Sequence, residues 1–121
     1  AVKVISQLLL SLPRGRNYKL IFMERPLHEV LASQDEMLKR RGSVEVVDTA
    51  LLTSAFHHHM REVVAWLEYR TDVPVCRVGY RKVLSDPTGS AKAVRDFLDI
   101  ALNVEAMALS VDPSLYRNRR P

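Results

Sequence analysis

The sequence predicts an α/β domain with a parallel sheet, and three observations support this prediction. Residues 20–23 are Leu-Ile-Phe-Met, a nearly continuous apolar run that is typical of a strand buried on both faces. A second apolar run, residues 73–78, follows two segments whose apolar residues recur at helical spacing. A helical crossover is the connection that parallel strands need. We therefore expect parallel strands near residues 2–5, 19–23 and 73–78, with helices covering both faces of the sheet.

The first helix is expected between Pro26 and Gly42. Proline suits the first helical turn because its φ is already helical and its missing N–H needs no partner there. Glu29 adds a negative charge near the positive end of this helix, and Gly42 follows three basic residues as a stop signal. The residues at helical spacing are Leu27, Val30, Leu31, Gln34, Met37 and Leu38.

Three more helices are expected along the chain. Asp48 is a good N-cap for a long amphipathic helix that extends to about Arg70. Ser90 is expected to cap a further helix, and residues 104–109 form a short turn or helix.

Arg25 stands where the strand at residues 19–23 meets the first helix. The carboxyl ends of strands beside helix N-termini bind phosphates in open α/β sheets, because unpaired N–H groups and the helix dipole face the anion. An arginine offers five N–H donors that suit a phosphate. From spacing alone, an ion pair of Arg25 with Glu29 or Glu24 is the simpler interpretation.

Residues 18–34 resemble the second motif of the sulfotransferases that use 3'-phosphoadenosine 5'-phosphosulfate (PAPS). In that family an arginine and a serine stand eight positions apart where a strand joins a helix, and Arg25 and Ser33 match them here. Residues 29–34, Glu-Val-Leu-Ala-Ser-Gln, are similar to the bacterial sulfotransferase-like branch. The resemblance implies that Arg25 and Ser33 bind the 3'-phosphate of PAPS, or of its product adenosine 3',5'-bisphosphate, without a metal ion.

Three further stretches resemble the family in the same order. Residues 2–13 are similar to the strand whose lysine contacts the transferring sulfuryl group, and Lys3 is the matching position. Residues 78–87 are similar to a segment with a tyrosine near the nucleotide, which Tyr80 matches, and residues 111–119 are similar to the C-terminal tail of the bacterial branch. The resemblance implies a catalytic role for Lys3 and nucleotide binding by Tyr80. From the residues alone, Lys3 could be a solvated lysine and Tyr80 a core aromatic residue at a strand end.

The sequence also departs from the family pattern. It contains no Gly-, Ser- and Thr-rich loop of the kind that grips the 5'-phosphosulfate in these enzymes. The position of the family's catalytic histidine is Ile5, and the acidic pair after the tyrosine is replaced by Arg81 and Lys82. The chain is therefore expected to be the C-terminal part of a sulfotransferase-like domain, a three-layer parallel sheet of the P-loop nucleoside-kinase type that lacks its first strand and loop. Catalysis by this chain alone is not expected.

Two functions are consistent with these observations. In the first, the complete protein transfers a sulfuryl group from PAPS to a hydroxyl or amine, and this chain holds the 3'-phosphate part of the nucleotide site. In the second, the chain is a truncated, non-catalytic module of the same fold that acts in assembly or binds nucleotide weakly. Because a missing strand would leave sheet edges and apolar surface exposed, we expect a homo-oligomer or a partner that supplies the missing segment.

Length and composition set further limits. A chain of 121 residues, of which 47% are hydrophobic and 26% charged, is sized for a single domain over residues 1–121. The net charge of +4 suits an anionic ligand but is too modest to predict nucleic-acid binding. No apolar run has the length of a membrane span. The single cysteine, Cys76, excludes an internal disulfide, so a cytoplasmic location is expected.

Three adjacent histidines, His57, His58 and His59, invite interpretation as a metal site. Consecutive helical residues point about 100° apart, so three neighbouring imidazoles cannot converge on one ion. We expect instead that His59 is half-buried packing and that His58 pairs with Glu62 at the surface.

Overall fold

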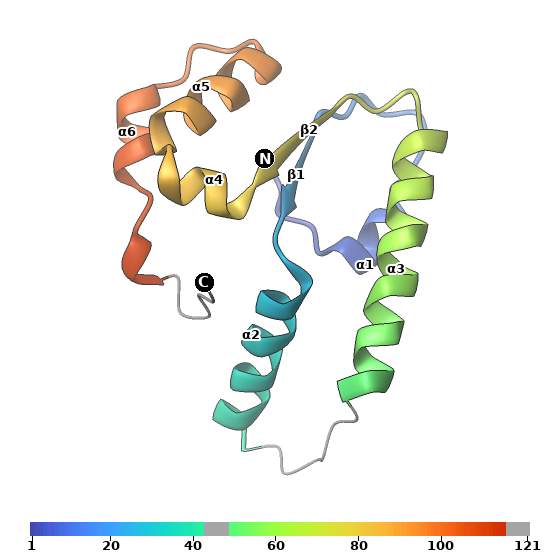
Figure 1. The fold of residues 1–121 in the computed structure, drawn as a ribbon. Helices are drawn as coiled ribbons and strands as arrows, with labels where there is room; N and C mark the ends of the chain where they lie inside the picture. Colours follow the sequence, from blue (N-terminus) through green and yellow to red (C-terminus); the bar gives the residue numbers. More distant parts are fainter. Residues whose placement is uncertain (43–48, 116–121) are drawn as a thin grey trace. The chain divides into compact units, whose positions relative to one another are not determined.

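The computed structural model describes residues 1–42 and 49–115, which form a mixed α/β structure with two strands and six α-helices (Figure 1). The described residues fall into two compact units: α1 and α3 belong to the first, and both strands with α2, α4, α5 and α6 belong to the second. No helix in these two ranges is long and apolar enough to cross a membrane. In chain order the elements are α1 (Ser6–Leu9), β1 (Leu20–Glu24), α2 (Leu27–Arg40), α3 (Thr49–Tyr69), β2 (Val75–Gly79), α4 (Tyr80–Ser85), α5 (Pro87–Leu98), α6 (Val104–Leu109) and a 3₁₀ helix (Pro113–Leu115).

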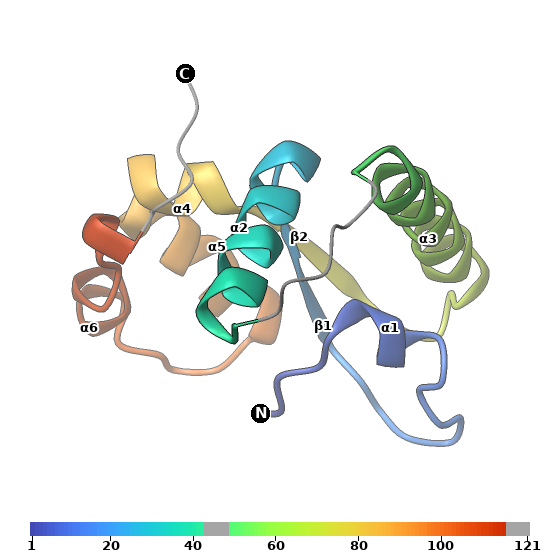
Figure 2. The ribbon, with the colours of Figure 1, turned by 90° about the horizontal axis from the view of Figure 1, so that it is seen from below.

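Strands β1 and β2 pair in parallel in the second unit (Figure 2). The register runs from Leu20 opposite Val75 to Glu24 opposite Gly79, so both strands end at the same edge. Two of the three predicted strands are thereby confirmed, with boundaries that differ from the prediction by one or two residues. Lys19, just before β1, donates from Nζ to the carbonyl oxygens of α5 residues 97 and 98 at 3.3 and 3.0 Å. This contact places a cation at the negative end of α5.

The prediction of a third strand, at residues 2–5, is wrong. Residues 1–5 have no regular structure, and α1 follows them directly. Val2 is 86% exposed and Ile5 is 58% exposed. Valine and isoleucine favour a strand only where a neighbouring strand takes up their backbone N–H and C=O groups. Among the described residues β1 and β2 pair only with each other, so this segment has no such neighbour.

The helix predicted between Pro26 and Gly42 is confirmed as α2. It carries Glu29 in its first turn and ends in two basic residues, and Gly42 follows in the left-handed region with φ of +71°. The long helix predicted to end near Arg70 is confirmed as α3, whereas its predicted N-cap, Asp48, lies outside the described residues. The short helix predicted at residues 104–109 is confirmed as α6.

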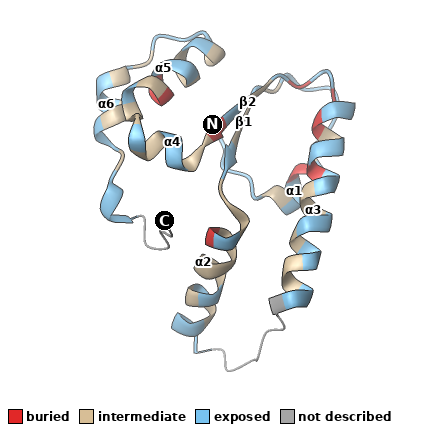
Figure 3. Cartoon of the chain, in the orientation of Figure 1, coloured by how far each residue is buried: buried red, intermediate tan, exposed pale blue. Residues whose placement is uncertain are grey.

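The first unit packs around one face of α3. Val63 and Leu67 of α3 are buried, as are Leu9 of α1 and Val73 after α3. Ser6 Oγ and His59 Nε2 lie 2.9 Å apart and link α1 to α3. His59 is only partly exposed, which confirms the packing role expected of it. Buried residues are nevertheless few, and most of the chain is intermediate or exposed (Figure 3).

Arg70 is a buried cation beside this apolar face, with 3% of its surface exposed. Its Nε and Nη2 donate to the two carboxylate oxygens of Asp72 at 2.8 and 2.9 Å, and Nη1 donates to the carbonyl of Leu12 at 3.3 Å. The guanidinium also lies over the ring of Trp66, 5.2 Å from its centroid. A buried charge is tolerated when it is paired and hydrogen-bonded in this way.

Helix α5 begins earlier than predicted. Asp86 is its N-cap and accepts a hydrogen bond from the Gly89 N–H at 3.0 Å, and Pro87 occupies the first helical position. The prediction that Ser90 caps this helix is wrong, because the Asp-Pro pair already provides the favoured cap and first residue. Ser90 lies inside the helix and is buried. Helix α5 then packs against α4, α6 and β2.

Replacing Val63 by Ala should destabilise the first unit. Val63 is fully buried, so the change removes two methyl groups and leaves a cavity, at a cost of about 2 kcal/mol. The adjacent Val64 is 36% exposed and serves as a matched control, for which we expect a cost of about 0.5 kcal/mol or less. Urea unfolding followed by circular dichroism measures both. Equal losses in the two variants would contradict this account of the core.

The ion pair of Arg70 and Asp72 should make stability depend on pH in the acid range. The hydrogen bond from Arg70 lowers the pKa of the Asp72 carboxyl below its ordinary value. A carboxyl whose pKa is lower in the folded state stabilises the fold above its unfolded pKa, about 3.9, and this contribution is lost as pH falls through the folded pKa.

Asp72→Asn should therefore be less stable than the wild type at pH 7, and the difference should disappear as pH falls through the lowered pKa of Asp72. Asp96→Asn, at an aspartate whose side chain is 71% exposed, is the control and should have little effect at either pH. Thermal unfolding between pH 2 and 7 measures the difference. A gap between wild type and Asp72→Asn that persists at low pH would contradict the assignment.

Candidate functional site

The candidate site lies at the edge where β1 and β2 both end. Because Glu24 and Gly79 are partners in the register, the residues that follow each strand emerge side by side. Arg25 and Pro26 lead from β1 into α2, and Tyr80 is the first residue of α4 directly after β2. This edge is the carboxyl end of the parallel pair, the position at which α/β sheets place ligand-binding residues.

Arg25 and Tyr80 are in contact at this edge. The Arg25 guanidinium lies over the Tyr80 ring, with its central carbon 4.5 Å from the ring centroid. A cation this close to an aromatic face is held by the ring quadrupole, typically with about 0.5–2 kcal/mol. Two residues that the family resemblance assigns to one site through separate motifs are thus adjacent. Tyr80 is half-buried and is the first residue of α4, directly after the end of β2.

Glu29 connects both sides of this edge, and its side chain is fully buried. Its Oε2 accepts from Arg25 Nε at 3.3 Å, and its Oε1 accepts from Arg81 Nε at 3.0 Å and Nη2 at 2.6 Å. The ion pair of Arg25 with Glu29, which the spacing suggested, is therefore present. Glu24 pairs instead with Arg77, at 3.6 Å.

Sequence reasoning missed Arg81 as a member of this group. It noted the residue only as a departure from an acidic family pattern, whereas the structure joins it to a carboxylate on another helix. The available signals were its position directly after Tyr80 and the placement of Glu29 four residues after Arg25. Neither signal shows that α2 and α4 begin next to each other, and that adjacency follows from the strand register.

The cluster joins two cations to one anion. Arg25 and Arg81 each carry +1, and the Glu29 carboxylate to which both donate carries −1. The Arg25 side chain is 21% exposed and the Arg81 side chain 49% exposed, whereas Glu29 is 0% exposed. The cations therefore face solvent more than the carboxylate does. Guanidinium N–H donors and an aromatic face are groups of the kind that contact an anion attached to a planar ring.

The other two predicted site residues are placed less centrally. Ser33 is on α2, one helical turn after Glu29, and is half-buried. Residues four apart share a helix face, so Ser33 continues the face on which Glu29 meets the arginines. Lys3 belongs to the first unit and is an exposed residue of the segment before α1.

The histidines of α3 form surface and packing contacts. His58 Nε2 lies 3.1 Å from Glu62 Oε1, which confirms the predicted pair. Within residues 1–42 and 49–115 no group of three or more His, Cys, Asp or Glu side chains is placed to hold a metal ion.

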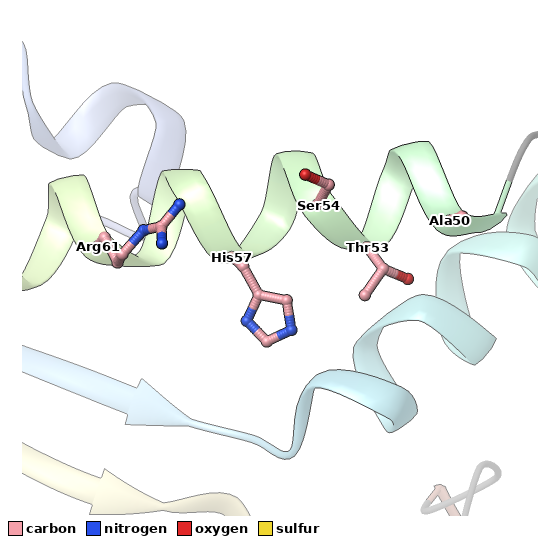
Figure 4. A pocket seen from close by; sticks show the side chains of 5 residues that line it. All are labelled: Ala50, Thr53, Ser54, His57 and Arg61. Carbon is pink, nitrogen blue, oxygen red and sulfur yellow. The ribbon is translucent and has the colours of Figure 1, made fainter.

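A hollow of about 810 Å³ lies along α3, lined by Ala50, Thr53, Ser54, His57 and Arg61 (Figure 4). All of these residues come from one face of the same helix, because they recur at helical spacing (Figure 4). A ligand pocket buries most of its ligand, which one face of a single helix does not do. The hollow is therefore not a second candidate site beside the cluster around Glu29.

Comparisons of the chain with protein-family models, with curated proteins and with solved structures gave no significant match.

Glu29→Gln should destabilise the second unit. The substitution removes the charge that both guanidiniums share and leaves them with a neutral, poorly matched partner, at a cost of about 2 kcal/mol. Glu36→Gln is the matched control, since Glu36 pairs with Arg40 on the same helix but has a 41% exposed side chain. For it we expect a cost of about 0.5 kcal/mol or less. Chemical unfolding of both variants measures the contrast, and a control as damaging as Glu29→Gln would contradict a structural role for the buried carboxylate.

Proposed function

We propose that this chain is part of a sulfotransferase-like protein and forms the 3'-phosphate side of its nucleotide site. The complete protein transfers a sulfuryl group from PAPS to a hydroxyl or amine acceptor. The observation that carries the proposal is the contact between Arg25 and Tyr80 at the carboxyl end of β1 and β2. Each residue was assigned to the nucleotide by a different motif, and the fold brings the two motifs together.

The roles of the residues follow from their chemistry. Arg25 binds the 3'-phosphate with its guanidinium, at the start of the 14-residue helix α2, whose N-terminal dipole also favours an anion. Tyr80 holds that guanidinium by its ring face and flanks the nucleotide. Ser33 donates its hydroxyl to the phosphate from the next turn of α2, and Lys3 neutralises charge on the transferring group. PAPS itself supplies the activated sulfuryl group, so the protein contributes positioning and charge.

The larger fold belongs to this proposal as well. We assign β1 and β2 to a three-layer parallel sheet of the P-loop nucleoside-kinase type, in which the strand that carries the phosphosulfate loop is not among these residues. A two-stranded sheet is only marginally stable by itself, so further strands or a covering surface would add to its stability. A second copy of the chain or a partner that carries the loop would provide them.

A second candidate function is a non-catalytic module of the same fold. The placement of Lys3 favours this alternative, because the proposed catalytic lysine lies in an exposed segment without regular structure. Such a module binds adenosine 3',5'-bisphosphate through the cluster of the second unit and transfers nothing. Nucleotide binding without turnover in a preparation that contains the phosphosulfate loop distinguishes the module from the enzyme.

Arg25→Ala should abolish or strongly weaken binding of adenosine 3',5'-bisphosphate. A charged hydrogen bond to phosphate is worth about 1.5–3 kcal/mol, which corresponds to a loss of about 10- to 100-fold in affinity. The control is Arg77→Ala, which removes the same charge from β2 at a side chain that is 52% exposed. Calorimetric titration at two salt concentrations measures both variants. Equal affinities in wild type and Arg25→Ala would overturn the assignment.

A further inference from the structure

The segment before α1 has the residues of a strand and no strand beside it. Residues 2–5 are Val-Lys-Val-Ile, and three of the four are β-branched, the type that strands favour. Val2, Val4 and Ile5 are 86%, 42% and 58% exposed. No backbone N–H or C=O group of residues 1–4 is hydrogen-bonded to another described residue. The segment therefore offers both the side chains and the backbone groups that strand pairing requires.

The outer edge of β1 is a matching acceptor. In a parallel pair, alternate residues of each strand direct their N–H and C=O groups away from the partner strand. Beyond its ladder with β2, β1 makes no backbone hydrogen bond to a described residue. Its residues 20–23 are all apolar, and Met23 is 50% exposed. This edge can therefore accept a strand as short as residues 2–5.

The outer edge of β2 is less suitable. Soluble proteins keep strand edges from pairing by placing charged side chains on them or by covering them with a helix or loop. β2 carries Arg77 at its centre, with a side chain that is 52% exposed, and α4 and α5 pack against this strand. β1 is charged only at its last residue, Glu24, and among the described elements only β2 packs extensively against it. Strand addition is therefore expected at β1.

The donor segment and the acceptor edge belong to different units of the chain. Residues 1–18 cluster with α3 in the first unit, whereas β1 belongs to the second. Helix α1, which follows the segment directly, is held on α3 by the buried Leu9 and by the contact of Ser6 with His59. A second copy of the chain satisfies both, because the segment of each copy can pair with β1 of the other. Such an exchange closes as a dimer, whereas one-way addition continues as a filament.

We infer that residues 2–5 of one copy add to the outer edge of β1 in a second copy, and that two copies do so reciprocally. In strand addition, main-chain hydrogen bonds give the affinity and alternate side chains give the specificity. Each sheet grows from two strands to three, the number from which a sheet with an apolar face is stable in water. The inference goes beyond the proposed function, because it depends on backbone pairing and not on the nucleotide.

The test is the mass of the chain, measured by sedimentation velocity over a range of concentrations. We expect a dimer at micromolar concentration. The test variant is Lys3→Pro combined with Val4→Pro. Neighbouring residues of a strand direct their N–H groups to opposite edges, so in either register one of the two prolines removes an N–H that faces β1. The dissociation constant of the dimer should rise by about tenfold or more.

Lys3→Thr combined with Val4→Thr is the matched control. It changes the same two side chains but keeps both N–H groups and a shape that strands favour. The dissociation constant should change by less than about threefold. Because residues 1–5 have no regular structure, neither variant should alter the fold, and circular dichroism with urea unfolding checks this. An equal loss of the dimer in both variants shows apolar contact without strand pairing and overturns the inference.

Hydrogen exchange of the wild type identifies the edge without any substitution. Formation of the dimer should slow exchange at residues 2–5 and 20–24 and leave residues 75–79 unchanged. Slower exchange at residues 75–79 without a change at 20–24 assigns the added strand to β2 and overturns the inference. The same comparison decides the question if the proline variant does not fold.

The inference and the proposed function fail separately. A wild-type chain that stays monomeric at every soluble concentration overturns strand exchange, and a mass that keeps rising with concentration overturns reciprocal pairing. Neither result bears on the titration with adenosine 3',5'-bisphosphate, which tests the proposed function. A dimer with the expected exchange pattern that does not bind this nucleotide supports strand exchange and counts against the proposed function.

Discussion

The second unit depends on one buried carboxylate. Glu29 has no exposed surface, so its charge must be matched by groups that donate to it, and Arg25 and Arg81 both do so. Because one guanidinium follows β1 and the other follows β2, these hydrogen bonds join the two strand-to-helix junctions. The orientation of Arg25 over Tyr80 follows from the same constraint, since Nε of Arg25 is held by Glu29 while its face meets the ring.

Polar contacts of this kind matter because the apolar core is small. Two parallel strands leave both faces and both outer edges to be covered, and only a few apolar side chains are buried in the described residues. Specific bonds hold the helices at several points: Lys19 binds the last carbonyls of α5, Asp86 caps its start, and Arg70 joins the end of α3 to Leu12. Each of these bonds pairs a backbone group or a charged side chain with a partner inside the chain.

Local patterns in the sequence predicted most elements, and non-local contacts account for the failures. The strands β1 and β2 and the helices α2, α3 and α6 follow from apolar runs, helical spacing and stop signals that act within a few residues. The prediction of a strand at residues 2–5 was wrong because these residues suit a strand, but a strand also needs a neighbouring strand with which to pair. The prediction that Ser90 is an N-cap was wrong because Asp86 and Pro87 form a better helix start nearby. The link from Glu29 to Arg81 could not be predicted, since it depends on the register that brings the start of α4 near the start of α2.

The carboxylate also resolves a conflict between the two arginines that donate to it. Two guanidiniums held close together repel each other, and the repulsion grows as they leave water. A buried carboxylate between them replaces that repulsion with two attractions. Both cations are thereby fixed in place, whereas two arginines without this carboxylate would lack that defined geometry. Under the proposed function, donors that are already fixed reduce the ordering that a phosphate needs when it binds.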